Sequence, residues 1–103
     1  MKLLVTTAPP EKAGEIARAL VSEKLVACAN VLPGVKSVYW WKGAVEDAAE
    51  SMILMKTVPE LAGAALARLA QLHPYEVPEG VVLEIEGGLA PYLQWIADST
   101  RGL

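Results

Sequence analysis

The chain has 103 residues, a length typical of one domain, and 53% of them are apolar while 20% are charged. This balance, without any low-complexity segment, excludes a disordered chain and predicts a single globular domain spanning residues 1–103. The formal net charge of -3 and the lack of a basic cluster argue against a nucleic-acid partner.

Targeting signals and cysteine content point to the cytoplasm. No apolar stretch is as long as a membrane span, and the apolar run after Met1 ends at Thr6, too early for a secretion signal. The single Cys28 excludes a disulfide within one chain and fits a reducing compartment. We therefore expect a cytoplasmic protein without a membrane partner.

The chain begins with a predicted strand followed by a predicted helix. Residues Lys2 to Ala8 have a strand-like pattern, and Pro9-Pro10 ends this strand and can open a helix. In the helix, apolar residues recur at the spacing that makes one stripe, namely Ala13, Ile16, Ala17, Leu20 and Val21. One face of this helix should therefore cover a sheet.

Two long strands should follow, from about Val26 to Thr57, folding back at Lys42-Gly43. A two-residue turn that ends in Gly suits a hairpin, because Gly tolerates positive φ. Pro33-Gly34 interrupts the outgoing strand and predicts a bulge or bend there. The return strand is predicted from Ala44 to Thr57.

This hairpin is too long for its domain to cover. A strand of about 14 residues spans about 46 Å, whereas a helix of about 13 residues spans about 20 Å. The end of the hairpin carries Tyr39-Trp40-Trp41. Because a large exposed apolar patch usually marks an interaction surface, we expect the hairpin to pack on another copy of the chain.

The second half of the chain contains two more helices and one strand. Thr57-Val58-Pro59-Glu60 fits a capping box at the start of a helix that runs to Leu72, and His73-Pro74 stops it. Val81 to Ile85 is predicted as a strand, and Pro91 to about Ser99 as a short C-terminal helix.

The order of elements predicts an α+β fold. A Pro-Glu-x-Ala-Gly pattern occurs at both helix starts, in residues 10–14 and 59–63, and indicates two related halves. This favours a ferredoxin-like βαββαβ arrangement, with two helices on one face of a four-stranded antiparallel sheet. The opposite face then has only the C-terminal segment to cover it, so its apolar side chains need a partner.

Four segments, in this order, resemble the CutA divalent-cation tolerance proteins: Leu25 to Asn30, Pro33 to Gly43, Met55 to Thr57 and His73 to Glu79. The resemblance runs nearly end to end. It implies a ferredoxin-like fold assembled as a homotrimer, similar in architecture to the PII signal-transduction proteins. It also implies a role in tolerance of copper and other divalent cations, and no reaction.

The candidate metal ligands are His73, Glu76, Glu79 and Cys28. His73 is the only histidine, and imidazole is the commonest ligand of copper and zinc. Glu76 and Glu79 can add carboxylate oxygens, and the thiol of Cys28 is a soft ligand for Cu(I). In the alternative interpretation His73 bonds the last carbonyls of its helix and Cys28 is a small buried hydrophobe.

One histidine and one cysteine cannot complete a four-ligand site within one chain. A tight site must therefore be shared between subunits, rich in carboxylates, or completed by water. Some members that this chain resembles carry a Cys at the position of Thr6 and a second His at the position of Leu72, both proposed there as copper ligands. Only His73 of that set is present here.

A second candidate site involves the aromatic segment. Tyr39 and Trp41 share one face of their strand. With Lys56 and Tyr75 they would line a cleft between subunits, where a cation and aromatic walls hold a small anionic ligand, as clefts do in PII-like trimers. Simple core or interface packing is the alternative. The acidic residues Glu46, Asp47 and Glu50 are expected to form a solvated strand edge.

The chain lacks a Gly-rich phosphate loop, paired cysteines with zinc spacing, and a nucleophile-base set, so we expect no catalysis. We predict a homotrimer that acts in the response to divalent cations, without a tightly bound cofactor but able to bind copper or another divalent cation. The alternatives are a PII-like sensor of a small molecule and a structural trimeric scaffold.

Overall fold

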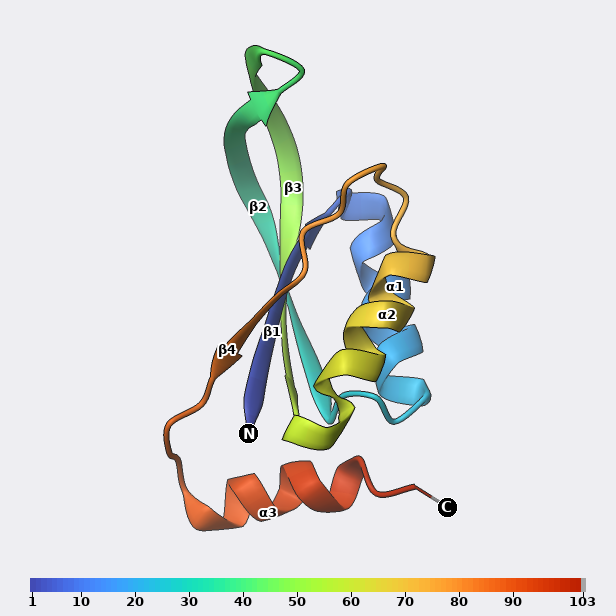
Figure 1. The fold of residues 1–103 in the computed structure, drawn as a ribbon, viewed down its shortest axis with the longest axis vertical. Coiled ribbons are helices and arrows are strands. Elements are labelled where there is room, and N and C mark those ends of the chain that lie inside the picture. Colours follow the sequence, from blue (N-terminus) through green and yellow to red (C-terminus); the bar gives the residue numbers. More distant parts are fainter. Residues whose placement is uncertain (103) are drawn as a thin grey trace.

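A computed structural model describes residues 1–102 as a four-stranded antiparallel sheet with helices packed against it. In chain order the elements are β1 (Lys2–Ala8), α1 (Pro10–Ser22), β2 (Cys28–Trp41), β3 (Ala44–Thr57), a 3-10 helix (Pro59–Leu61), α2 (Ala62–Leu72), β4 (Val81–Glu84) and α3 (Ala90–Ser99). The strands lie in the order β2-β3-β1-β4. This is the predicted ferredoxin-like fold, with α1 and α2 side by side on one face of the sheet (Figure 1).

The core lies between this face and the two helices. Its fully buried apolar side chains come from both layers: Leu4, Ala8, Ala13, Ile16, Leu20, Ile53, Met55, Ala65 and Leu69. Burying one large aliphatic side chain of this kind stabilises a fold by about 1.5–3 kcal/mol. The predicted stripe on α1 is confirmed except at Val21, which lies at the end of the helix and is exposed.

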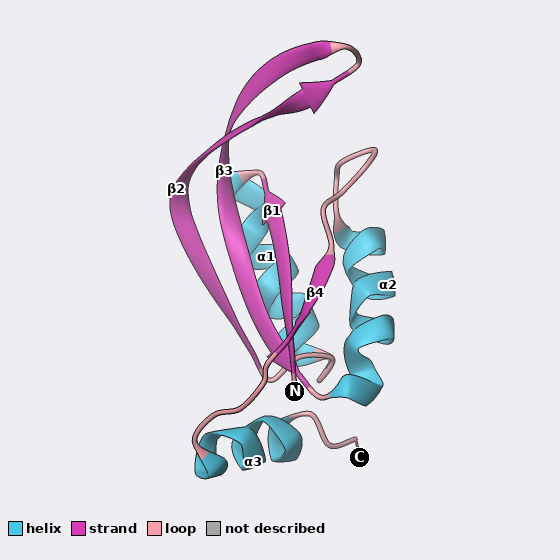
Figure 2. Cartoon of the chain, turned by 60° about the vertical axis from the view of Figure 1, so that its left-hand side comes forward, coloured by secondary structure: helices cyan, strands magenta, loops and turns pink. Residues whose placement is uncertain are grey.

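The hairpin of β2 and β3 has strands of 14 residues each, as the sequence predicts. β1 ends at Ala8, opposite Ser51, so the part of the hairpin that carries the turn continues past the helices (Figures 1 and 2). Lys42 at φ 49° and Gly43 at φ 82° form the turn, and positive φ at both residues is what a type I′ turn requires. Gly34, at φ 76°, lies inside the predicted bulge, which is confirmed as a register shift between Leu32 and Val35.

The predicted capping box at Thr57 is wrong. Thr57 is fully buried, and its hydroxyl donates to the backbone oxygen of Leu25 at 2.7 Å. Within residues 1–102, no side chain caps the 3-10 helix or α2. Because Thr57 is the last residue of β3 and faces the core, its hydroxyl serves the segment before β2, and Pro59 opens the helical region instead.

The face of the sheet opposite α1 and α2 is covered only in part. Leu32 and Leu83 lie on this face and remain exposed. α3 lies across the end of the sheet and buries Ile96, while Tyr92 and Trp95 stay partly open to solvent (Figure 2). No helix in the described part of the chain is long and apolar enough to cross a membrane.

Candidate functional site

His73 ends α2 and ties the following loop to β1. Pro74 favours an extended backbone at His73, which has φ -78° and ψ 134°. The imidazole is 7% exposed, its Nε2 lies 2.8 Å from the carbonyl oxygen of Thr7, and its Nδ1 accepts the amide of Tyr75 at 3.3 Å. Since a carbonyl only accepts, Nε2 carries the proton and the ring is the neutral tautomer. The alternative that His73 bonds the last carbonyls of its helix is therefore wrong, because the acceptor belongs to β1.

Glu79 reaches the same end of β1. The Thr6 hydroxyl donates to the backbone oxygen of Glu79 at 2.7 Å, and the Thr7 hydroxyl donates to Glu79 Oε1 at 3.3 Å. Thr7 thus contacts His73 through its carbonyl and Glu79 through its hydroxyl. Two of the four predicted metal residues, His73 and Glu79, therefore meet at the end of β1, and Glu76 lines the same cavity as Thr7 and Glu79.

Cys28, the fourth predicted ligand, lies at the other end of the sheet. It pairs with Lys56, which pairs with Leu3 on β1, four positions from Thr7 and hence about 13 Å along the strand. Its side chain is partly buried within the single chain. Its Sγ lies 3.5 Å from the hydroxyl of Tyr92, and this hydrogen bond, followed by partial burial, raises the pKa of Tyr92.

The residues that the structure describes do not form a closed metal site within one chain. Among the described residues, no group of three or more His, Cys, Asp or Glu side chains is arranged to hold a metal ion. Both ring nitrogens of His73 are already engaged within the chain, so a metal must displace one of these contacts. A metal site that includes His73, Glu76 and Glu79 therefore needs water or a second chain for completion.

A cavity of about 890 Å³ lies between the hairpin and the loop after α2. This volume is within the range of about 300–1,000 Å³ that is typical of small-molecule sites. Three of the four residues predicted for the cleft, Tyr39, Trp41 and Tyr75, line it. Lys56 is not among the described residues of its wall, because it lies near the far end of the hairpin, where its Nζ donates to Asn30 at 2.7 Å.

Glu50 is the residue of this cavity that sequence reasoning missed. The side chains of Glu46 and Asp47 are exposed as expected, but Glu50 is only 4% exposed, so the prediction of a solvated edge is wrong there. Its Oε2 accepts the hydroxyl of Tyr75 at 2.6 Å. Burial, and then this hydrogen bond, raise the pKa of Tyr75, so the hydroxyl remains a donor to Glu50.

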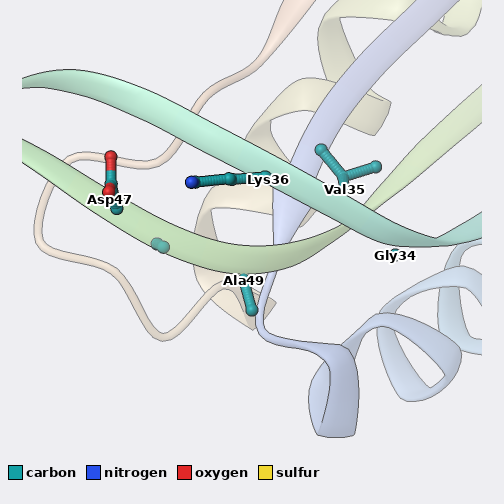
Figure 3. A pocket seen from close by; sticks show the side chains of 6 residues that line it. Gly34, Val35, Lys36, Asp47 and Ala49 are labelled. Carbon is teal, nitrogen blue, oxygen red and sulfur yellow. The ribbon is translucent and has the colours of Figure 1, made fainter.

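A smaller hollow, of about 380 Å³, lies beside the bulge of the hairpin (Figure 3). Lys36 and Asp47 are its charged residues, and Lys36 extends along the hairpin toward Asp47 (Figure 3). Lys36 pairs with Ala49, whereas Val35 pairs with Glu50. Because neighbouring residues of a strand point to opposite faces, the side chains of Lys36 and Glu50 lie on opposite faces of the hairpin.

Comparisons with known proteins agree with this architecture. The family model described as CutA1 divalent ion tolerance protein matches residues 1–99. The divalent-cation tolerance protein CutA of Thermus thermophilus is 42% identical over 98 residues, which cover 95% of each chain. A solved structure described as the PII-like protein CutA from Nostoc sp. PCC 7120 in apo form matches with a TM-score of 0.93 at 41% identity, covering 98% of each chain.

A chloroplastic protein CutA 1 of Oryza sativa subsp. japonica is 42% identical over 100 residues, which cover 96% of this chain and 56% of that protein. The chain thus spans about half the length of this plant relative. The element order, the long hairpin and the family match agree over nearly the whole sequence. The chain belongs to the CutA1 divalent ion tolerance protein family.

Proposed function

We propose that this protein acts in the response to divalent cations by binding copper or a similar divalent cation, and that it catalyses no reaction. The observation that carries the proposal is the meeting of His73 and Glu79 on Thr7, with Glu76 on the same cavity. Imidazole nitrogen with carboxylate oxygens is a donor set that suits Cu(II) and Zn(II). The family match, and a relative named for divalent-cation tolerance, support the role.

The proposed site is completed in a homotrimer or by water. His73 holds the Thr7 carbonyl through Nε2 at 2.8 Å and the Tyr75 amide through Nδ1 at 3.3 Å, so a metal that binds this ring displaces one of these two hydrogen bonds. The partly uncovered face of the sheet supports assembly, since Leu32 and Leu83 lie on it in the open. Because metal binding competes with contacts of the fold, we expect moderate affinity.

Metal titration tests this proposal. Chelator-stripped protein is titrated with Cu(II), and separately with Zn(II), against a competing chromophoric chelator, beside His73→Ala, Glu76→Gln and the control Glu60→Gln. Glu60 is an exposed carboxylate at the start of the 3-10 helix, away from Thr7. We expect binding at a fixed ratio per assembly that His73→Ala abolishes, Glu76→Gln weakens and Glu60→Gln leaves unchanged. Equal binding by all four proteins would contradict the proposal.

A sensor of a small molecule is the second candidate function, and the cavity of about 890 Å³ beside the hairpin favours it. The likeness to a protein described as PII-like supports it further. A non-metal ligand that co-purifies with the protein, detected by mass spectrometry under native conditions, is the expected result for a sensor. If the protein binds neither a metal nor such a ligand, a structural trimeric scaffold is the remaining interpretation.

A further inference from the structure

The charges around the large cavity favour a ligand of the opposite sign to the predicted anion. The anion site predicted between subunits includes Lys56, which within one chain donates to Asn30 at the far end of the hairpin and does not line this cavity. The carboxylates that line the cavity are instead Glu50, Glu76 and Glu79. Three carboxylates around one hollow repel an anion and attract a cation.

The positive charge near the cavity comes from Lys36 and, beside the Trp41 ring, from Lys42. Among the described residues that line the cavity, Lys36 is the single cation. Its side chain lies on the hairpin face opposite that of Glu50 and extends toward Asp47 (Figure 3). Lys36 is therefore not placed to neutralise Glu50.

Glu50 is the anionic group best placed to fix a ligand. It is 4% exposed, and Tyr75 donates to one of its oxygens, Oε2, at 2.6 Å. In the described part of the chain, every fully buried side-chain nitrogen or oxygen has a hydrogen-bond partner. Oε1 has no such partner there, so it is not fully enclosed, and Glu50 lines the cavity. A carboxylate held in one orientation, with one oxygen open, suits a single positive group.

Aromatic rings surround this carboxylate. Val35 pairs with Glu50, and faces alternate along a strand, so Tyr39 and Trp41 lie on the same face of the hairpin as Glu50. Tyr75 lines the cavity from the loop after α2. The Trp41 ring already attracts an ammonium group, since Lys42 Nζ lies 5.5 Å from its centroid. This distance is within the limit of about 6 Å for a cation-π contact.

We propose that this cavity binds a small organic cation bearing an alkylammonium group, with Glu50 as its counter-ion and Tyr39, Trp41 and Tyr75 as its aromatic walls. The proposal rests on the second candidate function, that of a small-molecule sensor, and it requires no metal at His73. The cavity volume, about 890 Å³, accommodates a small molecule.

Three probes of similar size and different charge test the proposal: tetramethylammonium, tert-butanol and pivalate. Each is titrated calorimetrically into the full chain in metal-free buffer, and the same titrations are run on Glu50→Gln, Trp41→Leu and the control Glu60→Gln. Gln at position 50 keeps an oxygen for the Tyr75 hydroxyl and removes the charge. Glu60→Gln makes the same change of charge at an exposed site outside the cavity.

We expect tetramethylammonium to bind more tightly than tert-butanol, and pivalate to show no binding. Glu50→Gln should weaken tetramethylammonium binding by about tenfold or more, Trp41→Leu by about threefold or more, and Glu60→Gln not at all. Pivalate binding as tight as that of tetramethylammonium, unchanged affinity in Glu50→Gln, or no binding of any probe would overturn the proposal.

The outcome is separable from that of the metal proposal. Glu50→Gln leaves His73, Glu76 and Glu79 in place, so a copper titration of this variant should match that of the unchanged protein. Loss of copper binding in His73→Ala together with failure of all three organic probes would retain the metal site and reject the cation cavity. Copper binding that His73→Ala leaves unchanged, together with tetramethylammonium binding that Glu50→Gln weakens, would retain the cavity and reject the metal site.

Discussion

At the scale of single residues, His73 is first a structural connection. His73 follows the last residue of α2, and its ring bonds both the Thr7 carbonyl on β1 and the amide of Tyr75 in the next loop. The residue is 7% exposed. Any metal that binds His73 must replace one of these hydrogen bonds. Metal binding at His73 is therefore linked to the position of the loop that carries Tyr75 and lines the cavity.

Replacing His73 should destabilise the fold measurably. In His73→Ala the Thr7 carbonyl and the Tyr75 amide both lose their partners. We expect a loss of about 1–3 kcal/mol in the free energy of unfolding, measured by urea denaturation. The control Gln71→Ala changes an exposed residue of the same helix turn and should stay within about 0.5 kcal/mol. A His73→Ala protein as stable as this control would remove the structural role.

Tyr75 should give the fold a pH dependence in the alkaline range. Burial first, and then the hydrogen bond to Glu50, raise its pKa above the ordinary value of 10.0. The folded chain therefore retains this proton at a pH where the unfolded chain loses it. The stabilisation is complete below about pH 10 and is lost as the pH rises from there through the folded pKa.

Tyr75→Phe tests this dependence, because it removes the titrating hydroxyl and keeps the ring. Between about pH 9 and about pH 11, the free energy of unfolding should fall more steeply for the unchanged protein than for Tyr75→Phe. Urea denaturation at each pH measures both slopes. Identical slopes would show that the Tyr75 hydroxyl does not favour the folded state in its protonated form.

At the scale of elements, the hairpin turn requires a glycine that a helix does not. Gly43 has φ 82°, a region where an L side chain is strained, so Gly43→Ala should destabilise the fold by about 1–2 kcal/mol. Gly14 lies inside α1 with open space where a Cβ would be added, so Gly14→Ala should stabilise it by about 0.5–1 kcal/mol. Thermal unfolding of both variants measures the contrast, and effects of the same sign would contradict this account of the turn.

The elements that the sequence predicts well are those set by local patterns. The bulge at Pro33-Gly34 and the turn at Lys42-Gly43 follow from the conformations that proline and glycine allow. The capping box fails because the hydroxyl of Thr57 finds Leu25, 32 residues away, and a short sequence window contains no information about that partner.

In the candidate site, too, local patterns predict some residues, whereas others depend on partners far away in the sequence. Alternation along the strand puts Tyr39 and Trp41 on one face, and both do line the cavity. Glu50 is missed because its burial depends on Tyr75, 25 residues away, which a loop carries over it. Within one chain Lys56 lies far from Tyr39, because their separation along the hairpin depends on the pairing register, so its place in a cleft between subunits stays a prediction.

At the scale of the whole molecule, the surface that α1 and α2 leave uncovered favours assembly. Leu83 pairs with Leu3 on this face and is 48% exposed, whereas Val21 on α1 is 38% exposed on the helical side. Leu83→Asp should shift the proposed trimer toward monomers, because a charge would be buried in the interface. Val21→Asp should leave assembly unchanged. Sedimentation velocity measures both, and equal effects would argue against this face as the interface.

Native mass spectrometry of chelator-stripped protein, recorded before and after addition of Cu(II), tests whether the assembly binds copper through His73. For a chain of 11.0 kDa, we predict an assembly of three chains, about 33 kDa. We expect a fixed number of copper ions on this assembly and none on a trimer of His73→Ala. Copper retained by the His73→Ala trimer, or an 11.0 kDa species that binds no copper, would contradict the account.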